Sequence, residues 1–141
     1  MKSKYDFEIQ KTEQEWKEQL SEDEFRVLRK AGTEMPGTGA YYLNDDSGNY
    51  YCKACNNELF TSDNKYQSGC GWPSFFDVVD ETKIIKRPDF SHDMIRTEVL
   101  CAKCGSHLGH LFEDGPTDKT GIRYCINSIS LNFKNNENIQ E

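Results

Sequence analysis

The sequence predicts an α+β fold that is mainly β, with N-terminal helices packed on an antiparallel β body. Two observations support this prediction. Apolar residues recur with helical spacing before residue 34, and from Tyr41 onward short β-prone runs separated by turn residues replace that spacing. Segregated helices and strands are typical of α+β folds. A chain of 141 residues fits a single domain, 1–141, with its core at about 12–134.

Two capping boxes mark two expected helices. Glu15 follows Thr12 by three residues and Glu24 follows Ser21 by three, so each hydroxyl and carboxylate pair can satisfy backbone N–H groups at a helix start. We expect the second helix to end at Gly32. The apolar side chains expected to pack against the body are those of Trp16, Leu20, Phe25 and Leu28.

Short β-prone runs follow the helices, with turn residues between them. We expect strands at 49–52, 58–61, 75–79, 94–101, 107–112 and 124–133. The segment after residue 134 is rich in Asn and Glu, and this composition predicts a disordered tail at 135–141.

Charge and composition exclude several classes of protein. The net charge of −7, from 17 basic and 24 acidic residues, argues against a nucleic-acid partner, which needs a basic face. No apolar run reaches the roughly 18 residues that span a membrane, and the N-terminus lacks the apolar stretch of a secretory signal. The expected location is the cytoplasm. Structural disulfides are rare there, so the six cysteines indicate metal or redox chemistry.

Four of the cysteines form two Cys-x-x-Cys pairs, Cys52 with Cys55 and Cys101 with Cys104. Two such turns supply four sulfurs, which form the closed tetrahedral set of a structural Zn²⁺ site. An iron–sulfur cluster is a rival interpretation, and a thioredoxin-like redox pair would need a βαβ context that is absent. A zinc hydrolase is disfavoured because four thiolates leave no position for water.

The other two cysteines belong to neither pair. Cys125 lies in a strand-like run between Arg123 and Asn127, and residues two positions away on a strand share its face. The arginine cation would lower the pKa of the thiol, and Asn127 could orient a bound group. The alternative is an inert buried cysteine. Glycines flank Cys70 and Trp72 follows it, which indicates either a mobile loop with an apolar wall or a turn with a core tryptophan.

The relation between Cys70 and Cys125 has two interpretations. They could form a static disulfide, or a disulfide that forms only during turnover, with one cysteine attacking and the other resolving. The expected cytoplasmic location favours the second.

Two histidines, His107 and His110, follow the second cysteine pair directly. Imidazole is the usual acid or base near neutral pH, so both are candidates for proton transfer. The alternatives are zinc ligation, which the four cysteines already fill, and ordinary polar packing. His92 is a weaker candidate for the same site.

Segments 68–76, 101–104, 107–110 and 123–128 together resemble the peptide-methionine (R)-S-oxide reductases, the B-type methionine sulfoxide reductases. Segment 20–34 is similar to the N-terminal region of that family. The likeness extends from about residue 12 to 134 and rests on five motifs in order. It implies a β-tent fold, one structural zinc, no organic cofactor, and reduction of the R epimer of methionine sulfoxide in oxidised proteins.

The resemblance also implies a role for each remaining cysteine. Cys125 would attack the sulfoxide sulfur and become a sulfenic acid, and Cys70 would condense with it to a disulfide. Thioredoxin would then reduce that disulfide. The chain carries Cys125 where some family members have selenocysteine, and we expect it to act as a monomer.

Other site residues are matched to the family one by one. His110 matches the acid that would protonate the sulfoxide oxygen, and Trp72 matches the wall that packs on the substrate methyl group. His107 and Asn127 match positions on the polar side of the site. We group Asn127 with the catalytic residues, and Arg123 with His107 and Trp72 as substrate-binding residues.

A second function is also compatible with part of the sequence. A non-catalytic, zinc-bound scaffold that binds a protein partner would explain the four paired cysteines. It would not explain Cys70, Cys125 or the two histidines, so the reductase is the favoured hypothesis.

Overall fold

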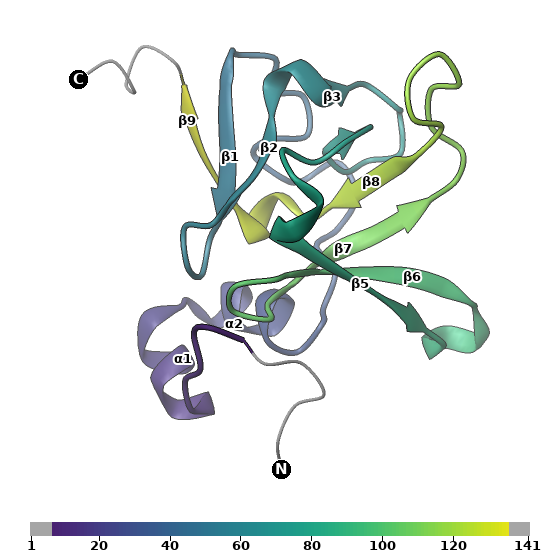
Figure 1. Cartoon of the computed structure of the whole chain (residues 1–141). Coiled ribbons are helices and arrows are strands. Elements are labelled where there is room, and N and C mark those ends of the chain that lie inside the picture. The colour runs from purple at the N-terminus through teal and green to yellow at the C-terminus, as the bar shows by residue number, and fades with distance from the viewer. Residues whose placement is uncertain (1–6, 136–141) are drawn as a thin grey trace.

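The structure, a computed structural model, describes residues 7–135. Within this range two short α-helices are followed by two antiparallel sheets (Figure 1), which confirms the predicted fold class. Residues 136–141, most of the predicted disordered tail, lie outside the described part, as does the side chain of His92. Among the described residues, no helix is both long and apolar enough to cross a membrane.

Helix α1 spans Glu13–Gln19 and helix α2 spans Glu22–Leu28. Both predicted capping boxes are confirmed. The hydroxyl of Thr12 or Ser21 accepts a hydrogen bond from the N–H three residues on, and the glutamate at that position accepts one from the capping residue. Each box satisfies two N–H groups that would otherwise lack a partner at the helix start.

The prediction that the second helix ends at Gly32 is wrong. Helix α2 ends at Leu28, and Ala31 then takes a left-handed backbone with φ of 57°. The Gly32 N–H still closes the turn by donating to the Arg26 carbonyl at 2.9 Å. The predicted apolar face packs on the core through the buried side chains of Trp16, Leu20 and Leu28 and the partly buried Phe25.

The described strands form two sheets in which every pairing is antiparallel. One sheet has the order β2-β1-β9 and the other the order β3-β4-β8-β7-β6-β5 (Figure 1). The strands are β1 (Gly48–Cys52), β2 (Glu58–Thr61), β3 (Lys65–Tyr66), β4 (Ser74–Phe75), β5 (Ile84–Asp89), β6 (Arg96–Cys101), β7 (His107–Phe112), β8 (Arg123–Ile126) and β9 (Leu131–Asn135).

The longest predicted strand, 124–133, is wrong as a single strand. Strand β8 ends at Ile126, a 3₁₀ turn follows at Ser128–Ser130, and β9 then runs in the other sheet. The Ser130 N–H donates to the Asn127 carbonyl at 3.0 Å, which closes the turn and redirects the chain. Asn127 therefore lies where the chain passes from one sheet to the other.

Two other strand predictions need correction. The predicted strand 75–79 shortens to β4, because the Asp77 carboxylate accepts the Val78 N–H and takes it out of the ladder. Strand β5 was not predicted, because it is a largely exposed edge strand that contains Pro88, a pattern unlike that of a buried strand. The remaining predicted strands are confirmed, with small shifts at their ends.

Aromatic side chains fill the core beside β8. The rings of Phe60 and Phe75 stack with centroids 4.2 Å apart, and Tyr124 packs against Phe60 at 5.8 Å. Because side chains alternate along a strand, the burial of Tyr124 turns Arg123 and Cys125 toward the opposite face of β8. The core thus fixes the face on which the unpaired cysteine lies.

Candidate functional site

The four paired cysteines meet in one cluster. Cys52 and Cys101 end β1 and β6, and Cys55 and Cys104 lie in the turns that follow. All four Sγ atoms lie within 4.8 Å of one another, with Cys52 to Cys104 at 3.8 Å. Sulfurs around a tetrahedral zinc with bonds of about 2.3 Å are about 3.8 Å apart. The predicted cluster is confirmed, and its donors and spacing are consistent with a structural zinc.

This cluster joins the two sheets. Strand β1 belongs to the three-stranded sheet and β6 to the six-stranded sheet, so one ion would hold both. The turns are possible because Asn56 and Gly105 take left-handed backbones, with φ of 67° and 79°. The Arg29 guanidinium, just after α2, donates to the Cys104 carbonyl at 2.9 Å. This bond attaches α2 to the turn that carries Cys104.

A second group of side chains lies along one cross-strand row of the six-stranded sheet. Cys125 is in register with Ser74 on one side and His110 on the other, and His110 pairs with Glu98. Opposed residues of antiparallel strands share a face, with Cβ atoms about 5 Å apart. Gly109 allows the close pairing, since a Cβ there would collide with the Cys125 carbonyl. The register of β7 and β8 therefore places Cys125, the predicted nucleophile, beside His110, the predicted acid.

Cys70 reaches this row from the loop between β3 and β4. Gly69 and Gly71 on either side take left-handed backbones, with φ of 79° and 100°. The Cys70 thiol donates to the Trp72 carbonyl at 3.4 Å, and its Sγ lies 3.7 Å from the Sγ of Cys125. A disulfide needs about 2.05 Å, so the two thiols are free but already in contact.

The two thiols differ in acidity. Burial raises the pKa of Cys125 to about 12, the adjacent Cys70 adds to the rise, and Arg123 opposes it. Burial also raises the pKa of Cys70, but hydrogen bonds with Ser68, Ser74 and neighbouring groups outweigh it, and that pKa falls to about 7. Arg123 thus acts in the predicted direction, yet burial is the larger effect. The first proton to leave the pair comes from Cys70.

Arg123 is held in place by its own contacts. Its guanidinium donates two hydrogen bonds to the Asp114 carboxylate, at 2.8 and 3.1 Å, and lies 4.4 Å from the centre of the Phe112 ring. A fork of this kind fixes the orientation of the cation. The charge of this fixed cation lowers the pKa of Cys125 more than its hydrogen bonding does.

His110 has a carboxylate partner that the sequence analysis missed. Its Nε2 lies 2.7 Å from Asp89 Oδ2 on the unpredicted strand β5. The Ser91 N–H and His110 hold the pKa of Asp89 well below its usual range. Burial lowers the pKa of His110 more than Asp89 raises it, so the imidazole titrates below its ordinary value of 6.5. The hydrogen bond to Asp89 favours a proton on Nε2.

His107 lies behind His110. Its Nδ1 is 2.6 Å from Glu98 Oε2, its ring centre is 5.5 Å from that of His110, and only 4% of the residue is exposed. Within residues 7–135, its Nε2 has no hydrogen-bond partner. His107 therefore does not line the cavity beside Cys125, although it was expected on the polar side of the site.

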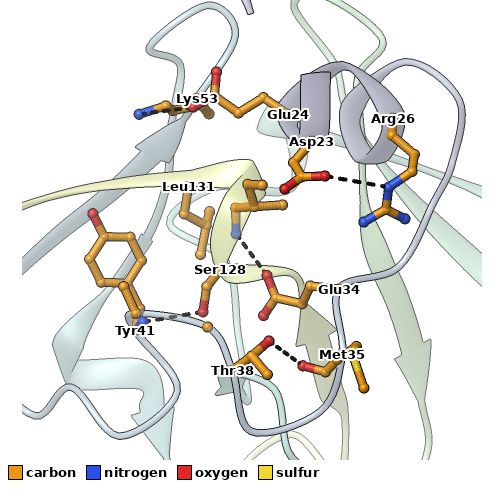
Figure 2. Close-up of a pocket in the computed structure, with 13 residues that line it drawn as sticks. Asp23, Glu24, Arg26, Glu34, Met35, Thr38, Tyr41, Lys53, Ser128 and Leu131 are labelled. Carbon is orange, nitrogen blue, oxygen red and sulfur yellow. Dashed lines mark hydrogen bonds and ion pairs between the residues drawn. The ribbon is translucent and has the colours of Figure 1, made fainter. Parts of the chain in front are cut away.

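Asn127 and Trp72 are both tied to Glu34, which the sequence analysis did not single out. Asn127 Oδ1 accepts the Glu34 N–H at 3.0 Å, and the Trp72 indole N–H donates to the Glu34 carbonyl at 3.0 Å. The Glu34 carboxylate accepts the Ile129 N–H at 2.9 Å, inside the turn that follows Asn127 (Figure 2). The Asn127 amide also donates to the Leu108 carbonyl at 3.1 Å.

A cavity of about 200 Å³ lies over Cys125 and brings most of the predicted residues together. Its lining consists of Thr33, Cys70, Trp72, Arg96, Gly109, His110, Phe112, Arg123, Cys125 and Asn127. A larger hollow of about 540 Å³, bordered by Glu34, Met35 and Tyr41 (Figure 2), contains neither unpaired cysteine nor a histidine. The reactive groups therefore place the site in the smaller cavity.

This cavity holds the groups that a thiol-dependent reductase would need. Two free thiols in contact, with an imidazole and an indole on the cavity wall, suit reduction of a small polar group on an apolar side chain. Comparison with known proteins identifies the kind of reductase. A family model described as the SelR domain matches residues 20–135.

The relatives agree with one another. The chain is 54% identical over 128 residues to the peptide methionine sulfoxide reductase MsrB of Leptospira interrogans, covering 91% of this chain and 97% of that protein. It is 54% identical over 125 residues to the MsrB of Hahella chejuensis, covering 89% of each, and 54% identical over 129 residues to that of Methanosarcina barkeri, covering 92% and 90%. The chain belongs to the MsrB family of peptide methionine sulfoxide reductases, which confirms the resemblance.

Proposed function

We propose that this reductase acts on the R epimer of methionine sulfoxide in oxidised proteins, with Cys125 as the nucleophile and Cys70 as the resolving thiol. The observation that carries the proposal is the 3.7 Å approach of the two sulfurs inside the cavity. Only Cys125 stands in register with His110, so only Cys125 has a candidate acid directly beside it.

The first step is attack of Cys125 sulfur on the sulfoxide sulfur. Because Cys70 ionises first, its thiolate can accept the Cys125 proton as the attack begins. The sulfoxide oxygen receives a proton from the His110 side, where Asp89 orients the imidazole. The hydroxyl group then passes from the methionine sulfur to the Cys125 sulfur, as the S–O bond and the new S–S bond to methionine both break. Methionine is released, reduced by two electrons, and Cys125 is left as a sulfenic acid.

The second step resolves the sulfenic acid. Cys70 sulfur attacks Cys125 sulfur, the S–S bond forms, and the oxygen leaves as water. Cys70 gives up the proton that it accepted in the first step, and this proton completes the water. A pKa of about 7 allows Cys70 to ionise again near neutral pH, which suits this attack. We propose that thioredoxin then reduces the disulfide. Reduction by thioredoxin needs a reducing compartment, so the cytoplasm remains the expected location. We also expect the chain to act as a monomer.

Substrate contacts follow from the cavity walls. The Trp72 ring, held at its N–H by Glu34, and the Phe112 ring provide apolar surface for the methyl and methylene groups. Arg123 and Asn127 provide the polar side. His107 acts one step further back, through Glu98 and the ring of His110, rather than on the substrate.

The four-cysteine cluster would hold one Zn²⁺ in a structural role. Four thiolates fill a tetrahedral ion and leave no position for water or substrate, so the ion would supply folding free energy rather than catalysis. The electrons come from the two other cysteines, and the proposed reaction needs no organic cofactor.

A single-turnover experiment tests the proposal. Reduced, zinc-loaded protein is mixed with a racemic methionine sulfoxide peptide without added reductant. We expect loss of about one equivalent of the R epimer and a Cys70–Cys125 disulfide, because each chain holds one dithiol. The Cys70→Ser variant should consume the same amount and stop at a sulfenic acid that dimedone traps. Consumption of the S epimer, or activity in Cys125→Ser, would refute the assignment.

The alternative hypothesis, a non-catalytic scaffold, predicts no reduction of either epimer in the same experiment. If the reduced, zinc-loaded wild-type protein consumes neither epimer, a binding role becomes the better explanation. Measuring zinc content first ensures that this outcome does not result from a misfolded sample.

A further inference from the structure

The hairpin between β5 and β6 ends in exposed apolar side chains that the proposed chemistry does not use. Phe90 is 67% exposed, Met94 45% and Ile95 84%, and all three lie around the 3₁₀ turn Ser91–Asp93. We call these three residues the apolar tip. Exposed apolar side chains that gather in one place mark interaction sites more often than isolated ones do.

The apolar tip is attached directly to the wall of the cavity. Asp89, just before Phe90, holds His110, and Arg96, just after Ile95, lines the cavity. These two residues are opposite each other in the ladder, and their side chains form an ion pair at 3.5 Å. The base of the hairpin is therefore part of the site, and the apolar tip continues from it.

The size of the cavity requires a surface outside it. About 200 Å³ holds one side chain, which is less than the space of a typical drug-sized ligand pocket, roughly 300 Å³ or more. The substrate of this family is a residue within a polypeptide, so its neighbours must lie across the rim. An extended chain advances about 3.3 Å per residue, so residues a few positions away from the sulfoxide reach beyond the cavity.

We propose that the apolar tip binds apolar residues flanking methionine sulfoxide in a locally unfolded segment of a client protein. The inference rests on the proposed function and specifies its substrates. Apolar flanks gain free energy by covering Phe90 and Ile95, and such flanks become accessible when a client unfolds. The exposed Asp93 beside them and the net charge of −7 disfavour acidic segments.

The test compares a double variant of the apolar tip, Phe90→Ser with Ile95→Ser, with wild type. Three substrates are used with dithiothreitol as reductant: free methionine sulfoxide, a peptide with Leu and Phe beside the sulfoxide, and the same peptide with Ser in their place. We expect about a tenfold loss of kcat/KM, mostly in KM, for the apolar peptide alone, because two partly buried contacts disappear. Leu43→Ser, at a position 70% exposed outside the hairpin, is the matched control.

Several outcomes would overturn the inference. Equal loss on all three substrates would mean that the hairpin only supports the cavity, and unchanged values would mean that clients do not touch it. A loss seen only when thioredoxin replaces dithiothreitol would assign the apolar tip to the reductant. If wild type reduces none of the substrates, the proposed function itself fails. Should the double variant not fold, Ile95→Ser alone gives the same comparison.

Discussion

The six cysteines lie in two regions of this molecule, a four-cysteine cluster and the pair of Cys70 and Cys125, and the two regions are built differently. In the four-cysteine cluster the sulfurs come from two strand ends and the turns after them, and all lie within 4.8 Å of one another. In the pair, Cys125 stands on a central strand and Cys70 on a loop with glycines at either side, and a cavity opens beside both. The cluster joins two sheets, whereas the pair faces a space that a substrate can enter.

The difference shows that surroundings decide what a thiol does. Four sulfurs at tetrahedral spacing satisfy a metal ion completely and leave no reactive position. Two sulfurs with unequal acidity, one at a pKa of about 7 and the other at about 12, would suit the two successive steps proposed above. Loss of a cluster cysteine should therefore affect folding, and loss of a paired cysteine should affect turnover.

The largest expected effect is loss of activity in Cys125→Ser. Turnover should fall by on the order of 10³ or more, because the proposed mechanism assigns the attack to Cys125 and Cys70 is not in register with the acid His110. The melting temperature should change little, since serine is similar in shape to cysteine. Steady-state assays with dithiothreitol and a thermal melt on the same sample check both expectations. A large fall in melting temperature would show that Cys125 also holds the fold together.

The opposite pattern is expected for Cys101→Ser in the cluster. The variant should lose zinc, and the melting temperature should drop by about 10 °C or more, because a structural metal contributes folding free energy. Any protein that remains folded should still form the Cys70–Cys125 disulfide. Metal analysis, a thermal melt and peptide mass mapping measure the three properties. An unchanged melting temperature after zinc loss would contradict the structural role of the cluster.

Features that are local in the chain could be predicted from the sequence. Thr12 with Glu15, and the pairs such as Cys52 with Cys55, are signals that span only four residues. The strand 107–112 also follows from local β propensity. The neighbours of a residue along its own strand could be predicted for the same reason, as with Arg123 and Cys125.

The partners that come from distant segments could not be predicted. Glu34 lies 93 positions from Asn127 and Asp89 lies 21 from His110, and both contacts depend on the register of strands and loops. Strand β5 lacks the apolar pattern of a buried strand, so the strand that carries Asp89 was not predicted. The single strand expected at 124–133 failed because the turn at Ser128–Ser130 depends on long-range contacts, such as the one from Tyr41 N–H to the Ser128 hydroxyl.

A smaller and more discriminating effect concerns the order in which the thiols ionise. Iodoacetamide should modify Cys70 before Cys125, with a midpoint near its pKa of about 7. In Cys70→Ser the midpoint of Cys125 should move down from about 12, because the neighbouring thiol raises that pKa. Peptide mass mapping at a series of pH values gives both curves. Modification of Cys125 first would reverse the order of acidity described above.

Asp89→Asn should weaken the acid. The carboxylate raises the pKa of His110, so its removal lets burial lower that pKa further below 6.5. The protonated fraction at neutral pH then falls, and single-turnover reduction should slow by about tenfold. The loss should be absent at a pH low enough to protonate both imidazoles, grow as the pH rises toward 6.5, and stay constant above it, because both pKa values lie below 6.5. Asp93→Asn, an exposed change in the same hairpin, is the control. A loss that does not vary with pH would point to a structural role for Asp89.

The smallest expected effect is at Glu34, which borders the larger hollow (Figure 2) and contacts Trp72 and Asn127 of the cavity through its backbone. Glu34→Ala removes the acceptor of the Ile129 N–H, and stability should fall by about 1–2 kcal/mol because a partly buried donor loses its partner. The backbone bonds to Trp72 and Asn127 persist but become less constrained, so KM should rise about threefold to tenfold with a smaller change in kcat.

The control is Glu34→Gln, which keeps an acceptor oxygen and should recover most of the lost stability and most of the change in KM. Urea unfolding and steady-state kinetics on the two variants separate these effects. Equal damage in Glu34→Gln would mean that the charge, rather than the hydrogen bond, positions this side of the cavity.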